Sequence, residues 1–110
     1  MQVIPLFQAP AQTVDVLLDG QHCSIFLYWR QERLYMDMLV DQDLLFQGAI
    51  CQNRADIVQL RSRDFTGTLH FFDMEGDRPP HWQGLRREGF GRWALVYVSA
   101  DEELPQKLKH

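Results

Sequence analysis

The sequence predicts an all-β fold, a small single-domain antiparallel β-barrel or sandwich with at most one short helix. Apolar and polar residues alternate with a period of two through most of residues 12–40, which is the pattern of half-buried strands. Short polar turns interrupt the alternation at hairpin spacing. The chain has 110 residues, enough to build one hydrophobic core but too few for two. We therefore expect residues 1–100 to form one β domain and residues 101–110 to form a polar C-terminal tail.

The clearest prediction within this fold is a three-stranded meander. Its first strand covers residues 13–18 and ends at Asp19-Gly20, a pair that accepts the positive φ angles of a two-residue hairpin turn. The second and third strands, residues 22–29 and 34–40, are separated by Gln31-Glu32. Both faces of these strands carry more apolar side chains than an isolated monomer needs.

The remaining strands are predicted from shorter apolar runs, at residues 2–7, 44–51, 66–74 and 92–99. Pro5 restricts the first of them to an edge of a sheet, because proline has no N–H to donate to a neighbouring strand. Gly48 lies inside the second and indicates a β-bulge or a close approach of the backbone. Residues 53–63 are the one candidate helix, with Asn53 as a possible N-cap, and residues 76–91 are expected to be irregular.

Composition and charge exclude several classes of function. Eleven basic against fifteen acidic residues give a net charge of −4, and Lys107 and Lys109 are the only lysines, so direct nucleic-acid binding is not expected. No run approaches the roughly 18 apolar residues of a membrane span, and the first residues lack the features of a signal peptide. We expect synthesis in the cytoplasm without export. Cys23 and Cys51 are expected to be buried free thiols, although a disulfide stays open.

The sequence offers no arrangement of residues that indicates catalysis. Its four histidines lack metal-ligand spacing, and none of its three serines lies in a G-x-S-x-G turn. His70 is expected to be a surface histidine or a half-buried one with its hydrogen bonds satisfied. Asp15, Asp37 and Asp73 lie in strand-like runs and are expected to face solvent. We therefore expect no enzyme activity, no catalytic, cofactor-binding or metal-binding residues, and no cofactor.

Two groups of residues suggest contact with other proteins. The first lies on the sheet face opposite the expected core and comprises Phe26, Tyr28 and Tyr35. The second lies in the irregular segment and comprises Trp82, Arg86, Arg87 and Phe90. Tryptophan and arginine are enriched in protein–protein hot spots. For the second group an alternative stays open, in which Trp82 and Phe90 fold back and cap one end of the domain.

Several motifs occur in the order typical of one protein family. They are V-I-P-L at Val3–Leu6, Q-T-x-x-V-x-L-D-G-Q at Gln12–Gln21, the run at 48–50, F-x-D-x-x-G-D at Phe71–Asp77, Pro79-Pro80, and L-V-Y-V at Leu95–Val98. In this order and spacing the chain resembles the baseplate plug family of contractile-tailed bacteriophages. The similarity covers most of the chain, from about Val3 to Ser99.

This resemblance implies a non-enzymatic structural protein of the virion tail baseplate, near the central hub beneath the tail tube. Its implied partners are other tail and baseplate proteins (hub, spike, wedge or tube), with possible self-association around the tail axis and no contact with nucleic acid or membrane. The alternative from another class is a small soluble β-barrel that binds a carbohydrate or another ligand. In that case Tyr28, Trp29 and Tyr35 would form a stacking platform.

Overall fold

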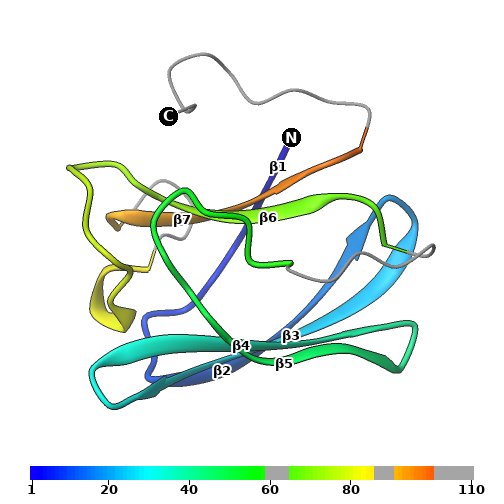
Figure 1. The fold of residues 1–110 in the computed structure, drawn as a ribbon, viewed down its shortest axis with the longest axis horizontal. Coiled ribbons are helices and arrows are strands. Elements are labelled where there is room, and N and C mark those ends of the chain that lie inside the picture. The colour runs from blue at the N-terminus through cyan, green and yellow to red at the C-terminus, as the bar shows by residue number, and fades with distance from the viewer. Residues whose placement is uncertain (59–64, 86–90, 101–110) are drawn as a thin grey trace.

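Two antiparallel sheets pack face to face in the computed structural model, which describes residues 1–58, 65–85 and 91–100 (Figure 1). One sheet has the strand order β2-β3-β4-β5 and the other β1-β7-β6. The elements are β1 (Gln2–Ile4), β2 (Ala11–Leu18), β3 (Gln21–Arg30), β4 (Arg33–Val40), β5 (Asp43–Ile50), β6 (Thr68–Asp73), the 3₁₀-helix η1 (Trp82–Gly84) and β7 (Trp93–Val98). The all-β prediction is confirmed. The predicted polar tail, residues 101–110, lies outside the described residues.

The four-stranded sheet is the predicted meander extended by β5. Its three hairpins all close through two-residue turns in which both residues have positive φ: Asp19-Gly20 (50° and 78°), Gln31-Glu32 (51° and 62°) and Asp41-Gln42 (50° and 73°). These angles define type I′ turns, whose twist matches that of the flanking strands. The turns therefore set a strand register in which Val14, Ile25 and Met38 lie side by side.

The bulge predicted at Gly48 is present in β5. The β4–β5 register shifts between Met36, which pairs with Ala49, and Met38, which pairs with Phe46. Gly48 has a φ of 71°, and its N–H donates a 2.7 Å hydrogen bond to the Asp37 carboxylate. The extra residue thus gains a side-chain partner where the ladder is interrupted.

The core lies between the two sheets. Ile25 and Met36 contribute from one sheet and Phe71 and Leu95 from the other, and all four side chains are fully buried. β7 is buried on both faces, since Ala94, Val96 and Val98 form a second cluster with Phe72 on the outer side.

A sandwich forms, and the barrel alternative is wrong for this chain. β2 and β5 end one sheet and β1 and β6 end the other, and no strand formed by the described residues pairs across the two sheets. β1 is an edge strand and stops at Ile4, directly before Pro5, as expected for a residue without an N–H. The sheets are joined instead by side-chain packing across the core.

The helix predicted at residues 53–63 is wrong for residues 53–58; the remainder lies outside the described residues. The chain here runs beside β6, and the N–H groups of Arg54 and Ile57 donate to the carbonyls of Phe71 and Leu69 at 2.6 and 2.8 Å. Asn53 does not cap a helix, because its amide oxygen accepts the N–H of Asp73 at 2.8 Å. Bonds to a strand that lies far along the chain thus replace local helical ones.

Cys23 and Cys51 are buried free thiols, as expected. Burial, together with the Asp41 carboxylate, raises the pKa of Cys23 to about 11. Burial raises the pKa of Cys51 well above its ordinary value of 9.0. Both groups therefore stay protonated at neutral pH, and the thiolate is the form that reacts.

We predict that Ellman's reagent at pH 8 modifies neither cysteine in the time that it takes to modify both in urea. The expected reduction in rate is at least 100-fold, because reaction requires exposure of the core. Stopped-flow or manual absorbance traces measure both rates. Rapid release of one or two equivalents from the native protein would contradict the buried positions.

Candidate interaction surfaces

The outer face of the β2-β3-β4-β5 sheet gathers the aromatic residues that the alternation predicted there. Phe26, Tyr28 and Tyr35 are partly buried and point away from the core. Tyr28 and Tyr35 are direct cross-strand neighbours, and their rings stack at 5.9 Å with an interplanar angle of 21°. Along the same face, Leu17 and Leu44 expose 54% and 59% of their surface. We call this set of five residues the aromatic face.

Asp37, beside the β5 bulge, holds the Tyr28 ring in place. The Tyr28 hydroxyl donates a 3.0 Å hydrogen bond to the Asp37 carboxylate, which also accepts the N–H of Gly48. Partial burial, and then the hydrogen bond to Asp37, raise the pKa of Tyr28 above its ordinary value of 10.0, so the hydroxyl stays a donor. A side chain that is already ordered loses less entropy on binding a partner. The sequence analysis did not predict this role of Asp37. The feature that could have indicated it is an acidic residue in the strand that pairs with the strand containing Gly48.

A second aromatic group lies at one end of the sandwich, where η1 meets the β3–β4 hairpin. The His81 ring packs between Trp29, at 4.4 Å, and Trp82, at 6.0 Å. His81 Nδ1 accepts the N–H of Gln83 and so caps η1. Trp82 is partly buried and packs against the core, which is the folded-back arrangement left open above. Arg86, Arg87 and Phe90 lie outside the described residues.

The three-ring stacking platform is wrong. Trp29 pairs with the buried Leu34 and packs against the core, whereas Tyr28 and Tyr35 lie on the other face. Successive strand residues point to opposite faces, so Trp29 and Tyr28 cannot share a surface.

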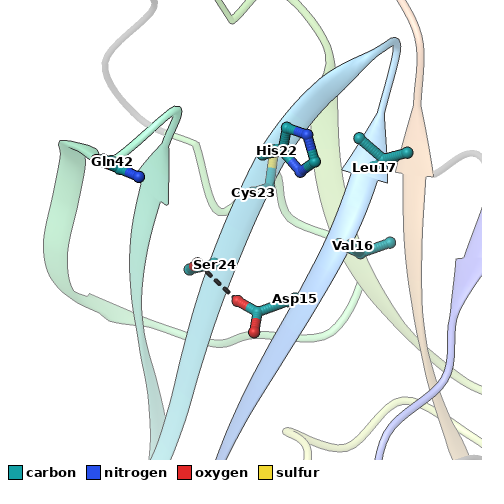
Figure 2. A pocket seen from close by; sticks show the side chains of 7 residues that line it. All are labelled: Asp15, Val16, Leu17, His22, Cys23, Ser24 and Gln42. Carbon is teal, nitrogen blue, oxygen red and sulfur yellow. Dashed lines mark hydrogen bonds between the residues drawn. The ribbon is translucent and has the colours of Figure 1, made fainter.

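A hollow of about 440 Å³ near the β2–β3 turn brings together a serine, a histidine and an aspartate (Figure 2). Ser24 Oγ donates directly to Asp15 at 2.7 Å. His22 lies two residues before Ser24, nearer the start of β3, and no hydrogen bond joins its ring to either side chain among the described residues. A hydrolytic triad needs the imidazole between serine and carboxylate, so this geometry does not activate Ser24.

Asp73 is the one of the three strand aspartates that does not face solvent. Its side chain has 0% exposure, which corrects the expectation from the sequence. It accepts two bonds from Arg92, at 2.6 and 2.8 Å, and the backbone N–H groups of Glu75 and Arg78, both at 2.9 Å. Its acceptor sites are occupied, so Asp73 anchors the segment after β6.

The other buried polar residue of the described part of the chain, His70, is satisfied in the same way. The buried His70 has both ring nitrogens within 2.8 Å of acceptors or donors, the Arg54 carbonyl and the Thr68 hydroxyl. Across residues 1–58, 65–85 and 91–100, His, Cys, Asp and Glu form no cluster suited to a metal ion. The same part of the chain has no helix with the length and apolar character needed to cross a membrane.

Comparison with known protein families gives a match over nearly the whole chain. The family model described as cyanophage baseplate Pam3 plug gp18 matches residues 1–101, which include all seven strands. Comparison with curated proteins gives no match. The family has a structural role in the phage baseplate and places the protein in the virion tail. The resemblance found in the motifs is thus confirmed, and the chain belongs to the phage baseplate plug family.

Proposed function

We propose that this protein acts without catalysis, as a plug near the baseplate hub, and that it binds neighbouring tail proteins through the aromatic face. The observation that carries the proposal is the stacked Tyr28–Tyr35 pair, held in place by Asp37 on a partly exposed sheet surface. The family match supports the location. We propose hub, spike, wedge or tube proteins as the partners.

The chemistry of the aromatic face suits protein contact. Stacked tyrosines offer a large apolar area and little side-chain entropy to lose, and Phe26 extends this area along β3. A standard interface covers about 800 Å² per partner, roughly an eighth of the 6681 Å² surface of this protein. A domain of this size therefore has room for more than one neighbour.

The aromatic face can be tested by the double substitution Phe26→Ala and Tyr35→Ala. Removal of hot-spot side chains costs about 2 kcal/mol or more of binding free energy, so we expect at least tenfold less protein in purified tails. Tyr28 is left unchanged, which preserves the hydrogen bond to Asp37. The measurement is quantitative mass spectrometry of tails assembled by a phage that carries the variant gene.

Met74→Ala is the matched control. Met74 is also apolar and 49% exposed, but it follows β6 and lies off the aromatic face, so wild-type incorporation is expected. Circular dichroism melts of the purified variants separate a docking defect from a folding defect. If the double variant folded and entered tails at the wild-type level, the aromatic face would not be the docking surface.

No observation favours the alternative of a ligand-binding barrel. Its platform required Trp29 on the same surface as the two tyrosines, and Trp29 packs against the core.

A further inference from the structure

The four-stranded sheet has a basic end and an acidic end. Arg30 and Arg33 flank the β3–β4 turn, while Asp41 is the first residue of the β4–β5 turn and Asp43 follows it directly. The two turns lie at opposite ends of the sheet (Figure 1). β4 has eight residues, so the ends are about 25 Å apart at roughly 3.3 Å per residue.

The basic end contains a hollow of about 420 Å³ beside the β3–β4 turn. Arg33 and Arg78 line it together with Trp29, Pro79 and the acidic Glu32. Neither arginine side chain has a hydrogen bond or ion pair within the described residues. We call this hollow the arginine cleft.

Three arginines line the arginine cleft, and only Arg92 among them has an ion-pair partner within the described residues. The Arg92 guanidinium is held by Asp73. Arg30 and Arg33 face each other directly across β3 and β4, and like charges in this position destabilise a sheet. Such a pair is tolerated at little cost if an external carboxylate neutralises it.

The β4–β5 turn at the opposite end has matching chemistry. Asp43 is exposed, and its carboxylate has no hydrogen bond or ion pair within the described residues. Leu44 follows it and exposes 59% of its surface. Asp41 accepts the N–H of His22 at 3.2 Å, which fastens the turn to β3. The turn thus presents a carboxylate and an apolar side chain from a rigid hairpin.

We propose that the β4–β5 turn of a second copy of this chain docks in the arginine cleft. Asp43 of one copy pairs with Arg33 and Arg78 of the other, and Leu44 lies against the apolar wall formed by Trp29 and Pro79. The two copies use different surfaces, so the contact is heterologous and continues from copy to copy, closing into a ring if the rotation allows.

A second copy fits better than an unrelated acidic partner, because this chain carries both halves of the contact. A protein with a net charge of −4 repels its own copies unless opposite ends meet. The contact uses Leu44 but leaves the three aromatic residues of the aromatic face, Phe26, Tyr28 and Tyr35, open to other tail proteins. The inference therefore goes beyond the proposed function and does not depend on it.

Sedimentation velocity of the purified protein tests this contact with two charge reversals, Arg33→Glu and Asp43→Lys. The wild-type protein is expected to associate at tens of micromolar in low salt. Each variant alone is expected to be monomeric, with association weakened at least tenfold. Each variant keeps one intact end, and the two reversed charges attract each other, so an equimolar mixture is expected to associate where neither variant does alone. High salt should dissolve the wild-type assembly, because the contact is exposed and charged.

The two variants control for each other. One makes the chain more acidic and the other less acidic, so a loss of association in both cannot come from net charge. Arg33→Glu places an opposite charge across from Arg30, so its melting temperature should not fall. The proposal is overturned if the wild-type protein stays monomeric, if either variant associates like the wild type, or if the mixture does not associate. The Phe26/Tyr35 double variant should associate normally, which separates this contact from docking through the aromatic face.

Discussion

Asp73→Ala is expected to lower the free energy of unfolding by about 2 kcal/mol, the cost of removing a buried acceptor from several donors, since the Arg92 side chain keeps 30% of its exposure and can be solvated. The Asp73 carboxylate receives two bonds from Arg92 and one each from the backbone N–H groups of Glu75 and Arg78. Its loss leaves these donors without a buried acceptor and frees the segment after β6. Urea unfolding at pH 7, followed by tryptophan fluorescence, measures the change.

The contribution of Asp73 to the free energy of unfolding should decrease at low pH. Arg92, and then the two backbone N–H groups, hold the pKa of Asp73 far below its ordinary value of 3.8. The unfolded chain therefore takes up this proton at a higher pH than the folded protein does. The stabilisation is complete above about pH 4 to 5 and decreases as the pH falls toward the folded pKa.

The conservative variant Asp73→Asn tests this linkage. It keeps the shape of the side chain but does not titrate, so its unfolding free energy should fall less steeply than that of the wild type between pH 5 and pH 2. Parallel curves for the two proteins would show that other carboxylates account for the acid sensitivity.

Gly67→Ala is expected to destabilise the protein by about 3 kcal/mol, the upper part of the range for overpacking. A Cβ at Gly67 would overlap the ring of Tyr97. The ring cannot move aside easily, because it packs on Phe65 at 5.6 Å and its hydroxyl donates to Asp19 in the β2–β3 turn. The substitution thus disturbs a contact that joins the two sheets.

Gly76→Ala is the matched control for Gly67→Ala. The nearest atoms to a Cβ at Gly76 are Arg92 Nη2 at 3.4 Å and Asp73 Oδ2 at 3.6 Å; both are ordinary van der Waals contacts, so a change within about 0.5 kcal/mol is expected. A smaller side chain at position 97, as in Tyr97→Leu, should reduce the cost of Gly67→Ala, and a double-mutant cycle measures this coupling. Equal effects of the two glycine substitutions would contradict the close contact.

The parts of the fold that were predicted correctly depend on neighbours in sequence. Alternation from residue 13 to residue 40 assigned Phe26, Tyr28 and Tyr35 to the outer face, because a strand has a period of two whatever it packs against. The Asp19-Gly20 pair predicted a tight hairpin for the same local reason. Gln31-Glu32 and Asp41-Gln42 form the same turn type without a glycine, which shows that the adjoining strands impose their positive φ angles.

Two of the incorrect predictions, for Asn53 and Asp73, concern residues whose partners lie far along the chain. Asn53 looks like a helix cap, but its amide binds the backbone of Asp73, twenty residues away. Asp73 looks solvent-facing in its strand, but Arg92 from the start of the next strand covers it. The error for Trp29 is local. Strand alternation assigns Trp29 to the core face, so it could not have formed a platform with Tyr28 and Tyr35 on the outer face.

Sequence alone determined the class of fold, the meander and the face on which the aromatic residues lie, because these follow from local periodicity and turn chemistry. It also determined membership of the baseplate plug family through the order of its motifs. The tertiary structure decided that the sheets form a sandwich, that Asp73 is buried, and which charges stay unpaired. Those properties depend on contacts between strands that are distant in sequence. The free energies of such contacts cannot be inferred from a local sequence pattern.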